Sequence, residues 1–195
     1  MSDQFSSKEL LIDGINKLQL SKIPTPEVDA RILLSHVINY QGIIYIHNNI
    51  LISKKEKNKF YDFLDKRIQG KPVSRIIGSR NFWKNNFLIN RYTLDPRPDS
   101  EVIIEAVNKI YCNNSKSIQV LDLGSGSGCI GLSIIDDLNN ASLLSADICK
   151  QALEQVKTNA KRLNLSKKIH CIKINWFKNN WIQNIKLITK KEKLF

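Results

Sequence analysis

The stretch that most constrains the fold runs from Val120 to Leu132 and reads Val-Leu-Asp-Leu-Gly-Ser-Gly-Ser-Gly-Cys-Ile-Gly-Leu. The apolar run over residues 118–123 predicts a buried parallel strand, and the apolar spacing after Gly128 predicts a helix. The alternating glycines between them permit positive φ angles and leave no Cβ to hold a ligand away from the backbone. Unpaired N–H groups at the helix N-terminus suit a carboxylate or a phosphate. The stretch therefore predicts the start of a nucleotide-binding βαβ unit.

Two cofactors fit this loop, depending on where the glycine pattern is counted from. Gly126-x-Gly128-x-x-Gly131 fits the dinucleotide pattern of NAD sites, but its first glycine falls two residues beyond the strand end. Counting from Asp122 gives Asp-x-Gly-x-Gly-x-Gly, with a glycine directly after the strand, which is the pattern of S-adenosylmethionine sites in class I methyltransferases. A glycine-rich structural turn without a ligand is the third interpretation. We favour S-adenosylmethionine and keep NAD as the alternative.

A second strand supplies the acid that either cofactor needs. Residues 143–147 read Leu-Leu-Ser-Ala-Asp and predict a strand that ends in Asp147, 23 residues after Gly124. A carboxylate at that place accepts hydrogen bonds from both ribose hydroxyls of adenosine. Asp147 is therefore the predicted ribose ligand.

The net charge of +12 raises the question of nucleic-acid binding. From Lys150 to the last residue there are twelve Lys and Arg against two Glu, in a region also rich in Asn and Ile. That combination is typical of AT-biased coding sequence, and no aromatic residues alternate with the lysines to form a stacking platform. We therefore interpret the basic region as a solvated face and do not expect nucleic acid as the substrate.

The remaining composition favours a cytoplasmic protein without metal. The first residues contain no apolar signal segment, and no stretch approaches the length that spans a bilayer. The four cysteines and three histidines are scattered, without metal-ligand spacing, which fits a reducing compartment. We expect no membrane association and no metal site.

Residues 1 to about 70 predict a small helical bundle. Ser6–Glu9 and Ser53–Glu56 each have the spacing of a capping box that opens a helix. Thr25 as N-cap and Pro26 at the first helical position predict another helix start. The apolar segment 42–52 is either a short helix or a packed connection. Nothing in this region carries chemistry by itself.

A linker follows the helices. Gly70-Lys71-Pro72 predicts their end, and the alternating residues from Phe82 to Leu94 predict a hairpin that joins two domains. Asp95 to Glu101 reads Asp-Pro-Arg-Pro-Asp-Ser-Glu and predicts a stiff polar segment that opens a helix.

Together these motifs resemble one family, the glutamine-N5 methyltransferases that modify peptide chain release factors (the HemK/PrmC type). The resemblance covers residues 8 to about 188. The matching motifs are Asp29-Ala30-x-x-Leu33-Leu34, Gly70-Lys71-Pro72 with Ile77-Gly78, Phe82, Pro96-Arg97-Pro98-Asp99-Ser100-Glu101, the loop from Val120 to Gly131, Ala146-Asp147 and Trp176-Phe177. The combination of the Pro-Arg-Pro segment with this glycine loop is the most specific part.

The resemblance implies an α/β fold with an N-terminal small helical bundle, a β-hairpin linker and an incomplete Rossmann-like class I methyltransferase domain. Residues 1–78 would be the helical domain that docks the release factor. Residues 79–95 would be the hairpin linker, and residues 96–195 the domain that binds S-adenosyl-L-methionine, truncated at its C-terminal end.

The resemblance also implies roles for single residues. The loop formed by Gly124, Ser125, Gly126, Ser127 and Gly128 would cradle the methionine part of S-adenosylmethionine, and Asp147 would hold the ribose. Trp176 would line the adenine pocket. Asn175 stands where the family usually has an acid that accepts from the adenine amino group, and its amide oxygen still accepts that bond without charge assistance. Cofactor- or substrate-proximal positions would be Phe82, Arg97, Pro98 and Glu101.

One departure from the family concerns catalysis. In the family the fourth strand ends in Asn-Pro-Pro-Tyr, which grips the substrate glutamine, whereas here Lys186-Leu187-Ile188-Thr189 is followed by a lysine-rich ending without that motif. We expect a chain truncated by a frameshift or a premature stop, with impaired or no activity. The alternatives are a non-catalytic remnant or release-factor-binding fragment, and a nucleic-acid amino-methyltransferase, whose relatives share Asn-Pro-Pro-Tyr.

Overall fold

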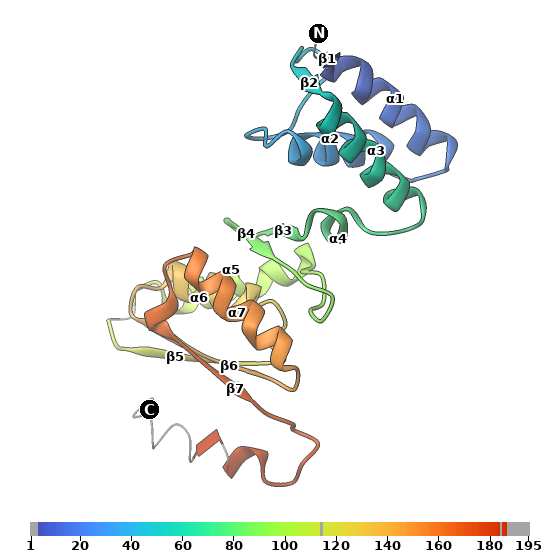
Figure 1. Cartoon of the computed structure of the whole chain (residues 1–195). Coiled ribbons are helices and arrows are strands. Elements are labelled where there is room, and N and C mark those ends of the chain that lie inside the picture. Colours follow the sequence, from blue (N-terminus) through green and yellow to red (C-terminus); the bar gives the residue numbers. More distant parts are fainter. Residues whose placement is uncertain (1–3, 114, 184, 187–195) are drawn as a thin grey trace. The chain divides into compact units, whose positions relative to one another are not determined.

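Residues 4–113, 115–183, 185 and 186 are described by a computed structural model, in which the chain divides into two units, Met1–Ile77 and Gly78–Phe195 (Figure 1). Each unit has its own apolar core. Of the predicted fourth-strand stub, Lys186 to Thr189, only Lys186 is described, and it is helical rather than extended. The rest of the stub and the lysine-rich ending lie outside the described residues.

The first unit is a small helical bundle with a short strand pair. Its elements are β1 (Gln4–Ser6), α1 (Ser7–Leu20), α2 (Pro26–Val37), β2 (Leu51–Ser53), α3 (Lys54–Ile68) and α4 (Val73–Ile77). Strands β1 and β2 pair antiparallel. The helices bury apolar side chains against one another, and the core consists of Leu10, Leu11, Leu18, Ala30, Leu33, Leu34, Val37, Ile44, Ile52, Phe60, Phe63 and Leu64. The predicted helical N-terminal region is confirmed.

One of the two predicted capping boxes forms in the structure. At α3, the Ser53 hydroxyl accepts from the Glu56 backbone N–H, and the Glu56 carboxylate accepts from the Ser53 N–H at 2.9 Å. The box predicted at Ser6 is wrong, because the Ser6 hydroxyl donates to the Asn49 side-chain oxygen at 3.0 Å. Pairing of β1 with β2 brings that partner close.

The linker differs from its sequence prediction in two details. The helices do not end at Gly70, because the five-residue helix α4 follows Pro72. The hairpin consists of β3 (Ser79–Phe82) and β4 (Asn85–Leu88), so its turn is Trp83-Lys84, and the residues after Leu88 form no further strand up to η1. Trp83 has a φ of 53°, a value that few non-glycine residues adopt. A tight turn at a tryptophan has no sequence signal, which is why it was not predicted.

The second unit contains a parallel sheet in the order β5-β6-β7, formed by β5 (Ile118–Leu123), β6 (Ala141–Asp147) and β7 (Ile169–Lys173). The other elements are η1 (Pro98–Ser100), α5 (Glu101–Tyr111), α6 (Cys129–Asp137), α7 (Lys150–Arg162) and η2 (Ser166–Lys168). Apolar side chains of all three helices pack with those of the sheet in one cluster. The α/β class with a Rossmann-like parallel sheet is confirmed.

The opposite face of this sheet is covered unevenly. Ile174 and Ile185 cover Leu144, Ala146 and Ile172 on β6 and β7. On β5, by contrast, Leu121 and Leu123 are each 43% exposed. Among the described residues, one face of the sheet therefore packs into the main core, and the other is covered over β6 and β7 more than over β5.

Candidate functional site

The glycine loop between β5 and α6 folds back over the end of β6. The N–H groups of Gly124 and Ser125 both donate to the Ala146 carbonyl, at 2.8 and 3.2 Å. Gly124, Gly126 and Gly128 have φ values of 80°, 54° and 79°, and Gly128 is the N-cap of α6. L side chains rarely adopt such angles, so the loop requires glycine at these places. The predicted strand, loop and helix are confirmed.

Two of these glycines also allow close packing. A Cβ on Gly128 would lie 3.0 Å from Val156 on α7, so this glycine lets the start of α6 approach α7. A Cβ on Gly124 would lie 3.3 Å from the Trp176 ring. The structure therefore brings the glycine loop and Trp176 together, although 52 positions separate Gly124 from Trp176 in the sequence.

Asp147, at the end of β6, connects its strand to the loop. Its buried carboxylate accepts from the Gly126 N–H at 3.0 Å with one oxygen and from the Cys149 N–H at 2.8 Å with the other. A carboxylate offers about four lone-pair sites, so each oxygen keeps capacity for one more donor. The predicted acid thus lies directly against the predicted loop.

A second carboxyl lies beneath the loop. Asp122 on β5 faces α6, where a Cβ on Gly131 would lie 2.9 Å from its Oδ2. Burial raises the pKa of Asp122, the Gly131 N–H opposes this, and the negative charge of Asp147 adds to the increase. The sequence placed Asp122 in the motif but gave it no role of its own.

Asn175 and Trp176 follow the end of β7. The Asn175 side-chain oxygen accepts from the Phe177 N–H at 3.0 Å, and the Ile174 N–H donates to the Asp147 carbonyl at 2.9 Å. Trp176 is 36% exposed. The glycine loop, Asp147 and these two residues therefore share the carboxyl edge of the sheet, where open α/β sheets bind ligands.

The other predicted positions lie around the hairpin. Phe82 is buried in the core, with its ring centroid 6.2 Å from that of Phe87. The Glu101 carboxylate accepts from the Trp83 N–H at 2.8 Å and so supports the hairpin turn. Arg97 and Pro98 are exposed where η1 begins. That Phe82, Arg97, Pro98 and Glu101 lie close to a cofactor or substrate stays a prediction.

Sequence reasoning missed Asn159, which lies on α7 and is 1% exposed. Its side chain bonds Leu88 of the hairpin and the Ser127 carbonyl of the glycine loop. Its position gave a signal, because it continues the buried stripe formed by Ala152, Leu153 and Val156. A polar residue on an apolar helical stripe indicates a specific buried partner.

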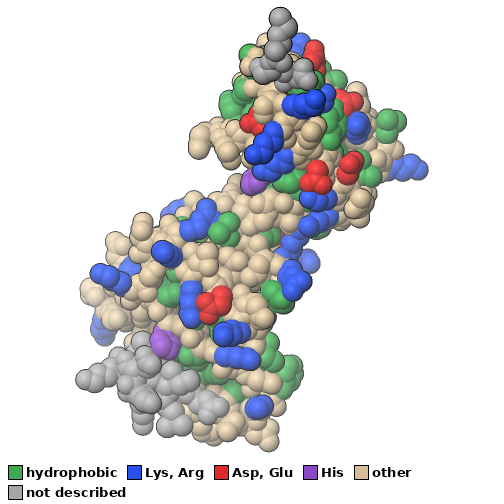
Figure 2. Space-filling model, viewed as in Figure 1, with side chains coloured by type: hydrophobic (Ala, Val, Ile, Leu, Met, Phe, Trp, Pro, Cys, Tyr) green, Lys and Arg blue, Asp and Glu red, His purple; other side chains and the backbone are tan. Residues whose placement is uncertain are grey.

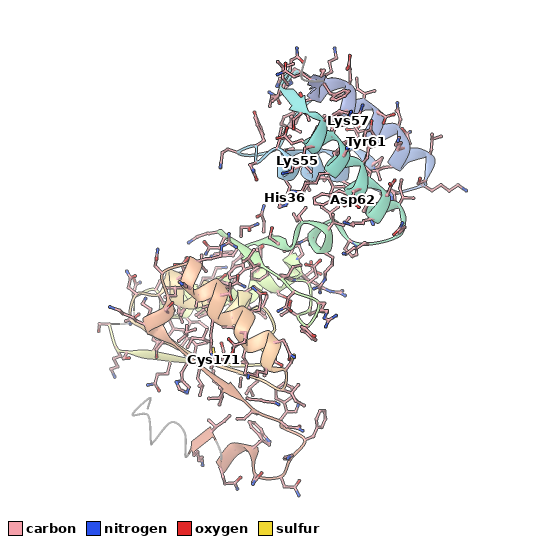
Figure 3. The ribbon with its side chains drawn as sticks, viewed as in Figure 1. His36, Lys55, Lys57, Tyr61, Asp62 and Cys171 are labelled. Atoms are coloured by element: carbon pink, nitrogen blue, oxygen red, sulfur yellow. The ribbon has the colours of Figure 1, made fainter. Side chains whose placement is uncertain are left out.

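Two thiols of this unit are withdrawn from solvent, Cys129 being buried and Cys171 partly buried. Burial raises the pKa of Cys129 to about 11, and burial raises the pKa of Cys171, on β7 in Figure 3, to about 11 as well. The thiolate is the reactive form of cysteine. Burial therefore disfavours the thiolate form of these two cysteines near neutral pH.

Other chemistry finds little support in the part of the chain that the structure describes. Among these residues no three His, Cys, Asp or Glu side chains are arranged to hold a metal ion. None of the helices described is both long and apolar enough to cross a bilayer. On the face drawn in Figure 2, the Lys and Arg side chains are spread over both units rather than gathered in one patch.

Comparison with protein families gives two matches that together cover most of the chain. Residues 9–78 match the family described as PrmC N-terminal domain. Residues 79–190, more than half of the chain, match the family described as Lysine methyltransferase.

Individual relatives are also methyltransferases by name. A protein of Rickettsia conorii named bifunctional methyltransferase is 33% identical over 90% of this chain and 38% of its own length. Proteins named release factor glutamine methyltransferase from Buchnera aphidicola and Agrobacterium fabrum are 36% and 32% identical, over 86% of this chain and 58% and 59% of theirs. The chain thus spans less than two thirds of the length of these relatives.

Among solved structures, the N-terminal domain of human METTL16 in complex with SAH is similar at 17% identity and a TM-score of 0.40, over 77% of this chain and 56% of that one. This likeness is too distant to indicate a function.

Proposed function

We propose, from the premise that the chain belongs to the HemK/PrmC-type methyltransferases, that it binds S-adenosylmethionine and serves the methylation of a glutamine side chain in a peptide chain release factor. The observation that carries the proposal is that the glycine loop, Asp147 and Trp176 meet at the carboxyl edge of the sheet. The names of two relatives support the choice of substrate.

The residues at this edge fit S-adenosylmethionine. Asp147 retains lone pairs for two ribose hydroxyls after accepting from the Gly126 and Cys149 N–H groups. The glycines leave room for the amino-acid end beside the start of α6, whose N–H groups favour a carboxylate. Trp176, lying against Gly124, offers an aromatic face for adenine. Asn175 keeps its Nδ2 donor and one lone pair on Oδ1, so it is still able to bond the base edge.

S-adenosylmethionine supplies a methyl group on a positively charged sulfur, and an amide nitrogen is a poor acceptor because its lone pair is delocalised. Positioning of the acceptor amide therefore matters, and it is worth up to roughly 7–11 kcal/mol in favourable cases. The family holds that amide with Asn-Pro-Pro-Tyr, which does not occur in these 195 residues. We therefore propose that residues 1–195 bind the cofactor and by themselves transfer the methyl group slowly.

Isothermal titration of the 195-residue chain tests the cofactor assignment. S-adenosylmethionine and its demethylated product are expected to bind saturably, and NAD is the matched control because it shares the adenosine moiety. The glycine loop and Asp147 satisfy the needs of both cofactors, so only the direct comparison separates them. Saturable binding of NAD together with no binding of S-adenosylmethionine would overturn the proposal.

A second experiment separates binding from transfer. The chain is incubated with a purified release factor and S-adenosylmethionine that carries a labelled methyl group, and the glutamine-containing peptide is analysed by mass spectrometry. We expect cofactor binding with methylation close to background. Rapid methylation would contradict the proposed impairment and would leave the cofactor assignment in place.

A third experiment concerns the partner. Residues 9–78 match the PrmC N-terminal domain, and we propose that this unit docks the release factor. Mixing the full chain with a release factor and measuring the complex by analytical ultracentrifugation tests this. A complex without methylation would favour the non-catalytic, release-factor-binding alternative, and the absence of a complex would overturn the docking role.

A further inference from the structure

Hydrogen bonds to two distant segments use three of the four hydrogen-bonding sites of the Asn159 carboxamide. Its Oδ1 accepts from the Leu88 N–H, and its Nδ2 donates to the Leu88 carbonyl and to the Ser127 carbonyl, each at 2.9 Å. Leu88 belongs to strand β4, and Ser127 belongs to the glycine loop. Burying a polar group is costly unless bonds of this kind replace the hydrogen bonds that the group made to water. Asn159 therefore joins the loop to the hairpin through α7.

The bond to the Ser127 carbonyl restrains the backbone of the glycine loop. Ser127 lies between Gly126 and Gly128, and glycine permits a wide range of φ and ψ. Gly126 is fixed by Asp147, and the Gly128 N–H donates to the Ser125 carbonyl at 2.7 Å. The Ser127–Gly128 peptide plane is fixed by both its carbonyl and its N–H. A rotation of that plane requires the Asn159 bond to break.

This plane also sets the direction of α6. Gly128 is the N-cap of α6, and its carbonyl accepts from the Leu132 N–H at 2.9 Å. The first N–H groups of the helix therefore take their direction from the peptide that Asn159 holds. They are the donors that a cofactor carboxylate would meet.

We propose that Asn159 is a positioning residue, which holds the glycine loop in the conformation that receives the amino-acid end of S-adenosylmethionine. The inference rests on the proposed cofactor. It adds a residue outside the loop, on α7, whose bonds determine cofactor affinity without touching the cofactor. It also makes hairpin strand β4 part of the support of the cofactor site.

The first test compares two variants of the full chain, each with one substitution in the second unit. Asn159→Leu nearly keeps the side-chain volume and removes all three bonds. Leu165→Ala is the matched control, because Leu165 is buried in the same core without bonding the loop. Melting temperature and affinity for S-adenosylmethionine are measured for both. We expect the affinity of Asn159→Leu to be at least tenfold lower than that of Leu165→Ala. Equal affinities in the two variants would show that Asn159 is merely structural.

The second test needs no variant and therefore stands even if Asn159→Leu does not fold. In the 15N-labelled chain, the two Nδ2 protons of Asn159 are expected to exchange slowly with solvent and to shift when S-adenosylmethionine is added to saturation. The exposed Asn58 on α3 is the control and should not shift. Shifts of the backbone amides in residues 124–128 without any shift at Asn159 would overturn this inference alone. No shift in the loop at all would overturn the proposed cofactor, and this inference with it.

Discussion

The two units bury different chemistry, and one buried glycine in each shows the difference. Gly14 on α1 faces the core of the first unit, where a Cβ would lie 2.7 Å from the Phe60 ring. Gly131 on α6 faces the sheet of the second unit, where a Cβ would lie 2.7 Å from Leu143 and 2.9 Å from an Asp122 carboxylate oxygen. Both glycines allow close packing. Only the second brings a helix against a buried charge-bearing group.

Buried polar side chains follow the same division. The buried acid of the first unit, Asp29, is paired with Arg67 at 2.7 Å and accepts from Thr25. In the second unit, Ser125 and Ser127 are buried within the glycine loop, and the buried side chains of Asp147 and Asn159 bond that loop. The other buried polar residues of this unit are Ser79, Thr93, Ser133 and Ser145. Among the residues that the structure describes, the hydroxyls of Ser125, Ser133 and Ser145 have no hydrogen-bond partner.

Unpartnered buried hydroxyls cost free energy, about 1–3 kcal/mol each, so a fold retains them where something other than stability is at stake. Of the three hydroxyls, that of Ser125 lies in the glycine loop, that of Ser133 on α6 and that of Ser145 on β6. The first unit, in contrast, pairs its buried acid Asp29 with Arg67 beside an apolar helical core. The comparison therefore assigns the chemistry to the second unit and predicts that substitutions in the two units affect different measurements.

The largest expected effect is on the stability of the first unit. Phe60 is fully buried against α1, and Phe60→Ala should destabilise this unit by about 3–5 kcal/mol because it leaves a cavity. Thermal unfolding followed by circular dichroism measures the loss. The exposed Leu20 is the control, and Leu20→Ala should change stability by less than about 0.5 kcal/mol. A loss of cofactor affinity in Phe60→Ala as large as its loss of stability would contradict the division of roles between the two units.

The second prediction is the reverse case, a loss of cofactor affinity from a substitution in the second unit. Asp147→Ala should lower the affinity for S-adenosylmethionine by about a hundredfold or more, because hydrogen bonds to a charged group are worth about 1.5–3 kcal/mol each and two ribose bonds are lost. The variant also frees the Gly126 N–H that holds the loop. Titration calorimetry measures the affinity, with the exposed Asp99→Ala as control. Wild-type affinity in Asp147→Ala would exclude Asp147 as the ribose ligand.

The third prediction concerns the clamp that holds the hairpin to the helices of the second unit. Asp137 at the end of α6 accepts from the Trp83 indole N–H, the Lys84 ammonium and the Asn108 amide, at 2.8, 2.6 and 2.6 Å. Burial raises the pKa of Asp137, but these three donors outweigh burial and hold the pKa below its ordinary value of 3.8. The ionised form is therefore favoured by folding.

The stabilisation from Asp137 is complete above the ordinary pKa and is lost as the pH falls through the lower pKa of the folded state. Asp137→Asn should cost about 1–3 kcal/mol near neutral pH and should show a weaker loss of stability below pH 3.8 than the wild type. Urea unfolding at several pH values measures both. Parallel pH profiles of the two proteins would mean that the clamp does not depend on the charge.

What sequence reasoning predicted well in this chain is local. The strand, glycine loop and helix over residues 118–137 follow from apolar spacing and from backbone angles that only glycine adopts readily. The capping box at Ser53 forms because both of its partner groups belong to Glu56, three residues further along the chain. The carboxyl edge could be predicted as well, because parallel strands end on the same side.

The misses depend on contacts between distant segments. The Ser6 hydroxyl bonds Asn49, 43 positions away, and so the predicted capping box is absent. Asn159 bonds Leu88 across 71 positions, so its role is invisible until the tertiary structure places both residues. The turn at Trp83 requires a positive φ, which a tryptophan in the sequence does not predict. Spacing along the chain carries no information about such partners.

The smallest effect expected is an alkaline titration in the first unit, where the one strongly shifted tyrosine reports on packing rather than on a site. Tyr61 on α3, labelled in Figure 3, donates to the Asp13 carboxylate on α1 at 2.8 Å. Burial raises the pKa of Tyr61 to about 12, and the hydrogen bond and negative charge of Asp13 add to the increase. The protonated phenol is therefore the form that folding favours.

Because the folded pKa lies above the ordinary value of 10.0, the stabilisation from Tyr61 is complete below pH 10.0 and is lost as the pH rises toward about 12. Phenolate absorbance should show a late titration step that Tyr61→Phe lacks. Asp13→Asn keeps an acceptor and removes the charge, so this variant should move the step to lower pH without changing cofactor affinity. A step that stays in place in Asp13→Asn would mean that burial alone holds the proton, and a change in affinity would break the separation between a unit that packs and a unit that binds.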